Sequence, residues 1–439
     1  MTSQEIFEQA NNLMVGGGCA GGRINGVLKR PLYITKADGC HVMTADGEEF
    51  IDYHTGAGAM MFGFKNPRIE AALLEGIKEG FYMNFESEHT LEFAKLFTQL
   101  VPTVEKIRIT NSGTEATMAA IRVARAYTGK NLIIKMDGHF HGMHEQIWYN
   151  GGFGIAYDDD GECVNIYDQT EGFPKNSHEN VKLIRFNDID AVKNVFRKYK
   201  GDIAALIMEP INYDCGCVIP DKEYMQQVRD LCTQEGILLI YDEVISGVRF
   251  RPGSAQGYFG VKPDLSTFAK AIANGFSLAL VGGKAEIMDM FNPIGPVTCS
   301  GTSSGNLLSV IAAKECIRMA LEPDFYSKIE HIENRLIGGI NDLFRKHQIP
   351  GHAASMGARF ALYFGYDDPA IDKDLEQTIK LYEDDMYKKF VEGCIEEKIY
   401  INYGVPMPFP HHSGFGIAHS DAVIDESLER MDRVFAKIK

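Results

Sequence analysis

Short apolar segments alternate with helical patterns between residues 105 and 283, and no other feature of the chain constrains its fold as strongly. Apolar strands separated by amphipathic helices are typical of a mostly parallel sheet that is covered by helices on both faces. The sequence therefore predicts an α/β fold for this part of the chain. The expected strands read KIRIT, LIIKM, VKLIRF, IAALIM, ILLIYD, LSTFA and ALVGG.

Small or charged residues follow several of these strands at the point where each strand ends. In open parallel sheets, functional side chains gather just beyond the carboxyl ends of the strands, because these ends meet at one edge of the sheet. We therefore expect a reaction centre at this edge. The candidates are Asn111-Ser112-Gly113-Thr114, Glu209-Pro210, Asp242-Glu243 and Lys270.

The regions before and after the alternating segment have patterns of their own. Turn dipeptides at Asp38-Gly39 and Asp46-Gly47 predict a β-hairpin near the amino terminus. Beyond about residue 305, helical patterns surround one strand-like stretch, ARFALYF, which predicts an α+β domain. We expect an amino-terminal segment with the hairpin over residues 1–65, which belongs to the small domain, a large cofactor-binding domain over 66–310 and a carboxyl-terminal small domain over 311–439.

A long stretch rich in glycine and aspartate, residues 149–180, separates two of the predicted strands. Connections of this length without secondary structure of their own are uncommon in compact domains and often serve as lids. The sequence therefore predicts a functional lid in this region.

Charge and composition limit the partners of the chain. The formal net charge is −16 and basic residues form no long run, which argues against binding to nucleic acid or to an anionic membrane surface. The first residues, MTSQEIFEQANNLM, lack the basic and apolar regions of a secretory signal, and no later apolar run reaches membrane-spanning length. Nine cysteines without a Cys-x-x-Cys pair suit reduced thiols and no metal site. We therefore expect a cytoplasmic protein.

The stretch RITNSGTEATMAAIRVARAYTG predicts a strand, a small polar turn and a helix. Free N–H groups at the start of a helix, together with the hydroxyls of Ser112 and Thr114, form a suitable site for a phosphate group. The same residues fit a plain capping box, with Ser112 as the N-cap and Glu115 three residues later. Taken alone, the turn favours the capping box.

Asp242 ends a very apolar strand, and Lys270 follows another strand within the stretch STFAKAIANG. A carboxylate at the floor of a crevice suits a cationic ring nitrogen, although an aspartate there equally suits a helix cap. Burial lowers the pKa of a lysine, and the resulting neutral amine can form a Schiff base. For any single lysine, a side chain that reaches the surface is the commoner arrangement.

The combination of these features is more informative than any one of them. A phosphate-binding turn, a strand-end carboxylate and a lysine among apolar residues are expected at one edge of the same sheet. These are the contacts that pyridoxal 5′-phosphate needs for its phosphate, its pyridine nitrogen and its aldehyde. We therefore expect pyridoxal 5′-phosphate as the cofactor.

Several stretches match one known family in the family's own order, namely ADGEEFIDY, NSGTEATMAAIRVARAYTGK, HFHG, MEP, YDEVISGVRF, AQGYFGVKPDLSTFAKAIANG and GTSSGN. From about Pro31 to its end, the chain resembles the class III aminotransferases of the type I pyridoxal-phosphate fold. Within that family it is most similar to the branch that contains glutamate-1-semialdehyde 2,1-aminomutase. The resemblance implies the type I fold and the cofactor already inferred from the residues.

The resemblance also implies a role for individual residues. Lys270 is expected to hold the cofactor as a Schiff base and to move protons, and Asp242 to pair with the pyridine nitrogen. Phe140 and Val244 are expected to pack on opposite faces of the ring. The phosphate is expected to bind at Ser112, Gly113 and Thr114.

Further positions are matched in the same way. Glu209 is expected near the cofactor, and Gly301 and Thr302 match a loop that reaches the phosphate of a neighbouring subunit, which implies a homodimer. Arg23 lies roughly where this branch places an arginine for the substrate carboxylate, and a bidentate guanidinium suits that task. A surface arginine is an equally good interpretation of Arg23.

Three departures from the family pattern bear on the reaction. Asp214 stands in EPINYDCG where the aminomutase branch usually has an asparagine near the phenolic oxygen of the cofactor. The stretch after Lys270, ANGFSLALVGG, lacks the usual proline, and YGVPMPFPHHSGFGIAHS differs from the aminomutases in its prolines and histidines. These departures concern the aminomutase activity and not the cofactor.

The residues leave several functions open. The leading hypothesis is an aminotransferase that moves an amino group between an amino acid or amine and a keto acid. The alternative is an isomerase on the same scaffold, either an aminomutase or an amino-acid racemase or epimerase, which consumes no keto acid. A racemase needs a second base, and the candidates are Asp214, His141 and Tyr149. A catalytically silent binding protein on this fold is disfavoured, because Lys270, Asp242 and the phosphate turn are all present.

Overall fold

A computed structural model describes residues 1–151, 156–401, 403–404 and 406–438. Its largest sheet contains the seven expected strands in the order β4-β12-β11-β10-β9-β5-β8. β12 runs antiparallel to β11 and to β4, and the other strand pairs of this sheet are parallel. This confirms the predicted α/β fold with a mostly parallel central sheet. The strands are β4 (Lys106–Thr110), β5 (Leu132–Met136), β8 (Val181–Ile184), β9 (Ile203–Met208), β10 (Leu238–Glu243), β11 (Leu265–Phe268) and β12 (Ala279–Gly283).

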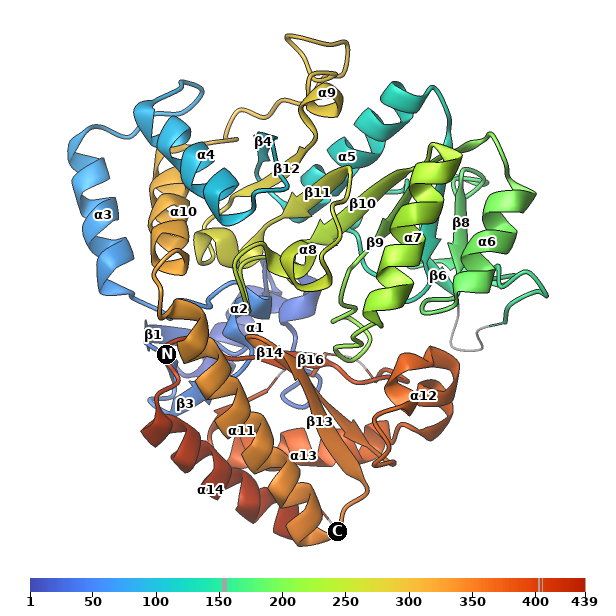
Figure 1. Cartoon of the computed structure of the whole chain (residues 1–439). Helices are drawn as coiled ribbons and strands as arrows, with labels where there is room; N and C mark the ends of the chain where they lie inside the picture. Colours follow the sequence, from blue (N-terminus) through green and yellow to red (C-terminus); the bar gives the residue numbers. More distant parts are fainter. Residues whose placement is uncertain (152–155, 402, 405, 439) are drawn as a thin grey trace.

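Helices cover both faces of this sheet (Figure 1). Alternate side chains of a strand point to opposite faces, so Ile240 packs on the α5 side whereas Leu239 and Tyr241 pack on the α7 side. The first face carries α5 (Gly113–Thr128) and α9 (Ala285–Met288), and the second carries α6 (Ile189–Lys198), α7 (Lys222–Glu235) and α8 (Ser254–Phe259).

Three further helices pack beside the central sheet, at the left of Figure 1. Pro67 at the first position of α3 fits a helix start, because proline has no N–H to leave unpaired there, and the Asn66 side chain caps the same turn. Arg68 of α3 pairs with Glu315 of α10 at 2.8 Å. The helices are α3 (Pro67–Lys78), α4 (Glu88–Leu100) and α10 (Leu307–Ala320).

Segments from the two ends of the chain share a four-stranded sheet of order β1-β2-β3-β15. β15 pairs in parallel with β3, with Ile399 opposite Ile51 and Tyr400 opposite Asp52. A three-stranded antiparallel sheet of order β13-β14-β16 lies beside it (Figure 1). The strands are β1 (Ile34–Asp38), β2 (His41–Thr44), β3 (Glu49–Asp52), β13 (Gly351–Met356), β14 (Arg359–Phe364), β15 (Ile399–Tyr400) and β16 (His412–Gly414).

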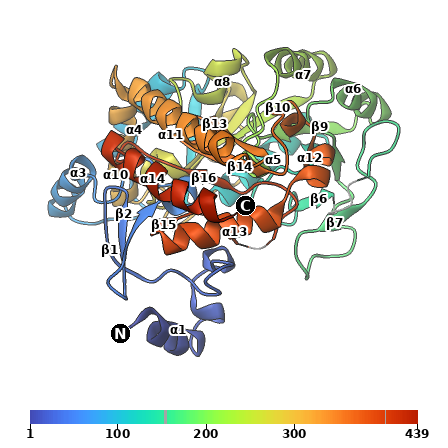
Figure 2. The ribbon, with the colours of Figure 1, turned by 90° about the horizontal axis from the view of Figure 1, so that it is seen from below.

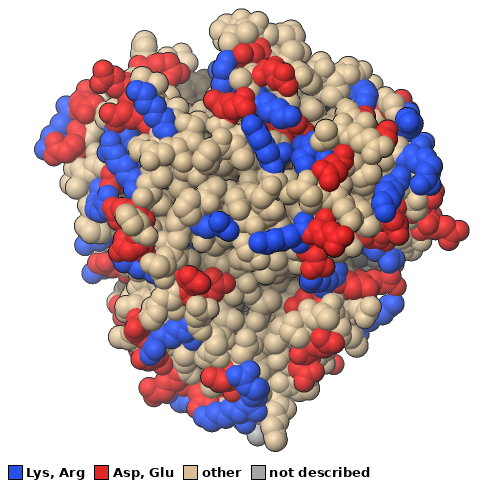
Figure 3. Space-filling model, viewed as in Figure 1, with Lys and Arg blue, Asp and Glu red and all other residues tan. Residues whose placement is uncertain are grey.

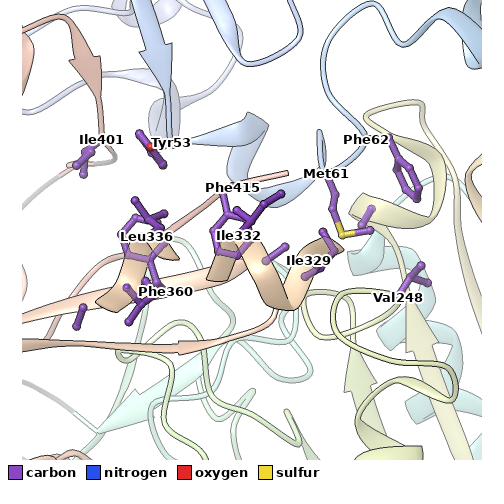
Figure 4. Packing of buried hydrophobic residues seen from close by; sticks show 14 of the residues in the cluster. Tyr53, Met61, Phe62, Val248, Ile329, Ile332, Leu336, Phe360, Ile401 and Phe415 are labelled. Carbon is purple, nitrogen blue, oxygen red and sulfur yellow. The ribbon is translucent and has the colours of Figure 1, made fainter. Parts of the chain in front are cut away.

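A continuous apolar core joins these sheets to the helices of the carboxyl-terminal part. Figure 4 shows Leu336 and Ile332 of α11 beside Phe360 of β14 and Phe415, with Tyr53 nearby. Apolar residues in α11 recur at helical spacing, which places one stripe of the helix against this core. The helices are α11 (Phe325–His347), α12 (Leu375–Leu381), α13 (Asp384–Glu396) and α14 (Asp421–Lys437).

The first residues form a helix that stands out from the body of the chain (Figure 2). Thr2 and Glu5 form a capping box at the start of this helix, and the N–H of Ser3 donates to Asp46 at 2.8 Å. The remaining short elements are α1 (Ser3–Asn11), α2 (Thr55–Gly58) and the 3₁₀ turns η1 (Val15–Gly17), η2 (Gly21–Arg23), η3 (Lys270–Ala273) and η4 (Ile371–Lys373).

The glycine- and aspartate-rich stretch over residues 149–180 contains a small antiparallel pair, β6 (Tyr149–Gly151) and β7 (Ile166–Asp168). Tyr157 of this stretch lies with its ring 4.6 Å from the guanidinium carbon of Arg185. Residues 152–155, which belong to the predicted lid, lie outside the described residues. The role of this stretch as a lid stays a prediction.

Surface charge is mixed on the face shown in Figure 3, where lysine and arginine side chains lie among aspartate and glutamate and form no continuous basic stripe. Among the helices that the structure describes, none is both long enough and apolar enough to cross a membrane. All nine cysteines are free thiols, as expected.

Candidate active site

The carboxyl ends of the parallel strands meet at one edge of the sheet, where a cavity of about 280 Å³ opens. The strand register brings the candidates together, since Asp242 of β10 lies opposite Thr267 of β11, and Tyr241 lies opposite Met208, the residue before Glu209. The cavity is lined by Ala59, Asn111, Ser112, Gly113, Thr114, Thr117, Phe140, His141, Gly142, Glu209, Asp242, Val244, Ile245, Ala269, Lys270, Gly275, Phe276 and Leu278.

Lys270 enters this cavity from the turn after β11. Ala269 is still extended, and Lys270 then takes a positive φ of 55°, a conformation that a lysine rarely adopts. Burial lowers the pKa of Lys270 to about 8, and the positive charges of Arg359 and Arg249 act in the same direction, whereas Asp214 opposes them. The amine is therefore partly neutral near physiological pH, as a Schiff-base lysine must be to react.

Asp242 is held in place by three hydrogen bonds. Its Oδ1 accepts from the Thr267 hydroxyl at 2.8 Å and from the Val244 N–H at 3.1 Å, and its Oδ2 lies 2.8 Å from Nδ1 of His141. Both Asp242 and His141 are buried. The carboxylate is thus fixed at the floor of the cavity with no freedom to turn away.

The turn before α5 combines both of the functions considered for it. The Ser112 hydroxyl accepts from the N–H of Glu115 at 3.2 Å, so Ser112 is the N-cap of the helix. Gly113 lies against Val244, and an added Cβ would come within 3.1 Å of a Val244 methyl group. Gly113 and Thr114, the first residues of α5, line the cavity beside this cap. A capped helix start therefore still offers a site for an anion.

Two acidic side chains lie close to Lys270 and differ in their surroundings. Burial raises the pKa of Glu209 well above its usual value, and the charges of Asp214 and Asp242 raise it further. Burial acts in the same direction on Asp214, but His412, Lys270 and Arg359 more than offset it and lower its pKa. Burial and the neighbouring carboxylates thus favour the protonated form of Glu209, whereas the neighbouring cations favour the ionised form of Asp214.

The cavity brings most of the predicted residues together, but not all of them. Arg23 is exposed in η2 and does not line the cavity. Gly301 and Thr302 also lie outside it, in a loop where Ser304 contacts Asn111 at 3.1 Å. Tyr149 is buried against Phe173, and neither Tyr149 nor Asp214 belongs to the cavity lining. The cavity lining includes Ser112, Gly113, Thr114, Phe140, His141, Glu209, Asp242, Val244 and Lys270.

Residues from the carboxyl-terminal part reach the same region, and sequence reasoning had not singled them out. Arg359 of β14 and His412 of β16 are buried or nearly so, and both act on the charge of Asp214. The unusual histidines of YGVPMPFPHHSGFGIAHS were the one signal that pointed to this region. His54 of the amino-terminal part also reaches this region. Burial and the charges of Arg359 and Lys270 lower the pKa of His54 to about 4.

A larger cavity of about 430 Å³ lies between residues 185–189 and residues 372–376. Its lining includes Asn212 and Cys215 but neither Lys270 nor Asp242. We therefore assign the candidate active site to the smaller cavity, where the reactive groups converge.

Comparison with known proteins places the chain in a family. Residues 25–380 match the family described as aminotransferase class-III. The chain is 34% identical to a protein named glutamate-1-semialdehyde 2,1-aminomutase 1 from Lachnoclostridium phytofermentans, over 100% of this chain and 99% of that protein. It is also 34% identical to a glutamate-1-semialdehyde 2,1-aminomutase from Persephonella marina, over 99% of each chain. The chain belongs to the class III aminotransferase family, as the sequence motifs predicted.

Solved structures support the same fold. A crystal structure of an omega-transaminase from Sphaerobacter thermophilus matches with a TM-score of 0.90 at 26% identity, over 100% of this chain and 98% of that one. A crystal structure of a glutamate-1-semialdehyde aminomutase from Pseudomonas aeruginosa PAO1 matches with a TM-score of 0.84 at 19% identity, over 100% of this chain and 94% of that one. The predicted type I fold is confirmed.

The residues of the cavity fit pyridoxal 5′-phosphate, the cofactor expected from the sequence and confirmed by the family assignment. Within the described part of the chain, the Lys270 amine has no hydrogen-bond or ion-pair partner, so it is available to an aldehyde. Asp242 lies at the cavity floor and can hold a protonated ring nitrogen. The start of α5 can hold the phosphate, and Phe140 and Val244 offer apolar surface for the ring.

Proposed function

We propose that this protein is a pyridoxal-phosphate-dependent isomerase that moves an amino group within one small carboxylate-bearing substrate, as a 2,1-aminomutase does. The observation that carries the proposal is the 34% identity over the whole chain to proteins named glutamate-1-semialdehyde 2,1-aminomutase, combined with the convergence of Lys270, Asp242 and the α5 start on one cavity. This reverses the order of the sequence analysis, which placed the aminotransferase first.

The side chains divide the work of such a reaction among them. When bound, the cofactor supplies an aldehyde that condenses with amines and a ring that accepts electrons. Lys270 would hold the aldehyde, and its amine would accept or return the proton on the substrate carbon. Asp242 keeps the ring nitrogen protonated, and Ser112, Gly113 and Thr114 hold the phosphate.

An aminotransferase remains the second candidate, because the chain shares a TM-score of 0.90 with an omega-transaminase at 26% identity. The same side chains serve both reactions, and the difference is whether the amino group leaves with the product. A racemase or epimerase is a third possibility. Of its candidate second bases, Asp214 interacts electrostatically with Lys270, whereas His141 is the one that lines the cavity.

The deciding experiment supplies the purified holoenzyme with glutamate 1-semialdehyde and no keto acid. An aminomutase converts it to the isomer whose amino group has moved from carbon 2 to carbon 1, and the Lys270→Ala variant does not. A requirement for a keto acid, consumed in equal amount, would instead identify an aminotransferase. If solvent deuterium enters the α-carbon of an amino acid with inversion and no migration, the enzyme is a racemase.

We also propose a homodimer in which the Gly301-Thr302 loop serves the cofactor phosphate of the partner subunit. Large apolar side chains are exposed near this loop, with Phe85 74% and Leu91 56% exposed, and both line a hollow together with Gly301. A contiguous exposed apolar surface of this kind is typical of a subunit interface.

Subunit mixing tests the shared site. A Lys270→Ala subunit keeps an intact loop, and a Thr302→Asp subunit keeps an intact lysine, so neither parent homodimer is expected to be active. After unfolding and refolding together, a loop that acts in trans restores one site in each hybrid dimer, which is about a quarter of wild-type activity. If the loop acts within its own subunit, mixing restores nothing.

A further inference from the structure

Arg359, His412 and the half-buried Asp214 form a chain of contacts that leads from β14 toward Lys270. Arg359 is only 1% exposed. Its Nη1 donates to the Thr55 hydroxyl at 3.2 Å, and its Nη2 donates to the carbonyl oxygen of His412 at 3.2 Å and to Nδ1 of the same residue. Within the described residues, Arg359 forms no ion pair with a carboxylate.

The position of Arg359 is fixed by the sheet. Arg359 lies opposite Gly414 in the β14–β16 pair, and a methyl group at Gly414 would overlap Nη1 of the guanidinium. Gly58 closes the other side, because a Cβ there would lie 3.2 Å from the same nitrogen. Two glycines thus form the slot that aims the guanidinium at His412.

The contact between Arg359 and His412 decides which ring nitrogen of His412 carries the hydrogen. A guanidinium can only donate hydrogen bonds, so Nδ1 of His412 must be the acceptor. A neutral imidazole has one N–H, and it must then be on Nε2. Burial and the nearby Arg359 lower the pKa of His412 to about 3, so the ring is neutral near physiological pH.

Nε2 of His412 lies 3.4 Å from Oδ1 of Asp214, within ion-pair distance of the carboxylate. Asp214 Oδ2 is buried and makes no hydrogen bond to any described residue. Glu209 likewise has one oxygen, Oε1, that accepts from the Phe140 N–H at 3.0 Å, and one buried oxygen without a partner among the described residues. Among the described residues, only Asp214 of these two carboxyl groups lies within ion-pair distance of an imidazole nitrogen.

We propose that Arg359 is a positioning residue that fixes the Nε2–H tautomer of His412, so that His412 presents an N–H, and not a lone pair, on the side of Asp214. The inference rests on the proposed active site, but it does not depend on which amino-group reaction takes place there.

Several elements contribute charged or titratable groups around Asp214, and each bears on its protonation. His412 and Arg359 come from the small sheet, Lys270 follows β11, and Glu209 follows β9. His141, Lys135 and Cys215 also experience the charge of Asp214. Because the pKa of Asp214 is lowered, its charge is present at neutral pH and is lost as the pH falls.

The tautomer can be observed directly in the holoenzyme by NMR of ¹⁵N-histidine. The His412→Gln variant identifies the resonances of His412, because they disappear from its spectrum. We expect one protonated Nε2 and one unprotonated Nδ1 in the wild type and in Arg359→Lys, which keeps a donor. Arg359→Met removes the donor and is expected to give a mixture of tautomers. A protonated Nδ1 in the wild type overturns the proposal.

Kinetics provides a second readout. In Arg359→Met the acid limb of the kcat/KM profile is expected to move up by about one pH unit, with kcat reduced and KM changed by less than about threefold. Arg359→Lys should recover most of this shift. A large rise in KM with an unmoved acid limb would show that Arg359 binds the substrate instead, and would contradict the proposal.

Double substitution separates a relay from general damage to the fold. His412→Gln retains an amide donor that does not need Arg359, so adding Arg359→Met to His412→Gln should cost little further activity. Fully additive losses of activity in the double variant would contradict the proposal that Arg359 acts through His412. The tautomer measured by NMR remains meaningful if the enzyme proves to be an aminotransferase, so failure of the proposed reaction and failure of this inference give different results.

Discussion

His141 and Asp242 form a buried pair in which Nδ1 of the imidazole lies 2.8 Å from Oδ2 of the carboxylate. Burial lowers the pKa of His141 although the hydrogen bond to the neighbouring Asp242 opposes the effect. The ring is therefore a neutral donor through Nδ1, and it leaves the negative charge of Asp242 undiminished. Such a neutral partner orients a carboxylate without competing for its charge.

Removing the charge of Asp242 tests its role. Asp242→Asn keeps the shape of the side chain, and we expect turnover to fall about 10²- to 10³-fold, as when other preorganised electrostatic contacts are lost. The measurement is kcat/KM together with the cofactor absorbance that survives dialysis. Asp264→Asn is the control, because Asp264 is a buried carboxylate that pairs with Arg229 at 2.8 Å, outside the cavity lining. Equal turnover in Asp242→Asn and wild type would exclude the assigned role.

The reactivity of Lys270 should depend on pH in an unusual range. Burial lowers the pKa of Lys270 to about 8, and the amine reacts only when neutral. In cofactor-free protein, the rate of trapping with pyridoxal phosphate and borohydride should rise with pH and reach half its plateau near pH 8. Peptide mapping identifies the modified lysine, and Lys270→Ala provides the blank. A rate that still climbs steeply above about pH 10 would mean that the amine is solvated like an ordinary lysine.

The close approach of Gly142 to Thr114 should matter for holding the phosphate. Gly142 has a φ of +95°, and a Cβ there would lie 2.8 Å from the Thr114 Cα. Gly142→Ala is therefore expected to displace the start of α5 and to weaken cofactor binding by at least about tenfold, measured by fluorescence titration of the apoprotein. Gly129→Ala is the matched control, since Gly129 also has a positive φ of +67° but open space around its Cβ position. Equal losses in the two variants would point to backbone strain alone.

Stability should fall with rising pH because of Glu243. Burial raises the pKa of Glu243 to about 7 despite hydrogen bonds from Ser246 and Ala255. The stabilising contribution of the protonated form is complete below the unfolded pKa of about 4.3 and is lost as the pH rises through 7, by up to about 4 kcal/mol. The glutamine in Glu243→Gln cannot ionise. The free energy of unfolding of this variant in urea should therefore rise relative to that of the wild type between about pH 5 and pH 8.5. Glu330 is exposed, and Glu330→Gln is the control that should show no such rise. A parallel pH dependence of the unfolding free energy in Glu243→Gln and wild type would argue against this assignment.

The central sheet could be predicted from the sequence because its strands are apolar on both faces and are short, uniform and separated by helices. The same regularity predicted which side chains would meet, since Asp242 and Lys270 are fixed by strand ends that share one edge. The positive φ of Lys270 could not be predicted in this way, because nothing in the local residues distinguishes a strained lysine from an ordinary one.

Arg359 and His412 were missed because their position depends on the packing of a small sheet against the large one. Neither residue belongs to a local pattern that indicates a reaction centre, and the short strand β16 holds His412 through only three paired positions. Arg23 shows the opposite case. Its position in the sequence matches that of a substrate-binding arginine in the family, but within one chain its side chain does not line the cavity. Long-range packing, and contacts between subunits, lie beyond what residue patterns specify.

The parallel pairing of β3 with β15 has a consequence for synthesis of the chain. Ile51 and Asp52 of β3 pair with Ile399 and Tyr400 of β15, which are synthesised much later. His54 and Thr55 follow directly after β3, and Thr55 contacts Arg359. During translation the large sheet can form first, while the amino-terminal strand keeps an unpaired edge until nearly the whole protein has emerged. The side of the active site that Arg359 and His412 form is therefore completed late, because β14 and β16 lie near the carboxyl end of the chain. A nascent or truncated chain that ends before β15 is expected to be recognised by chaperones as unfinished.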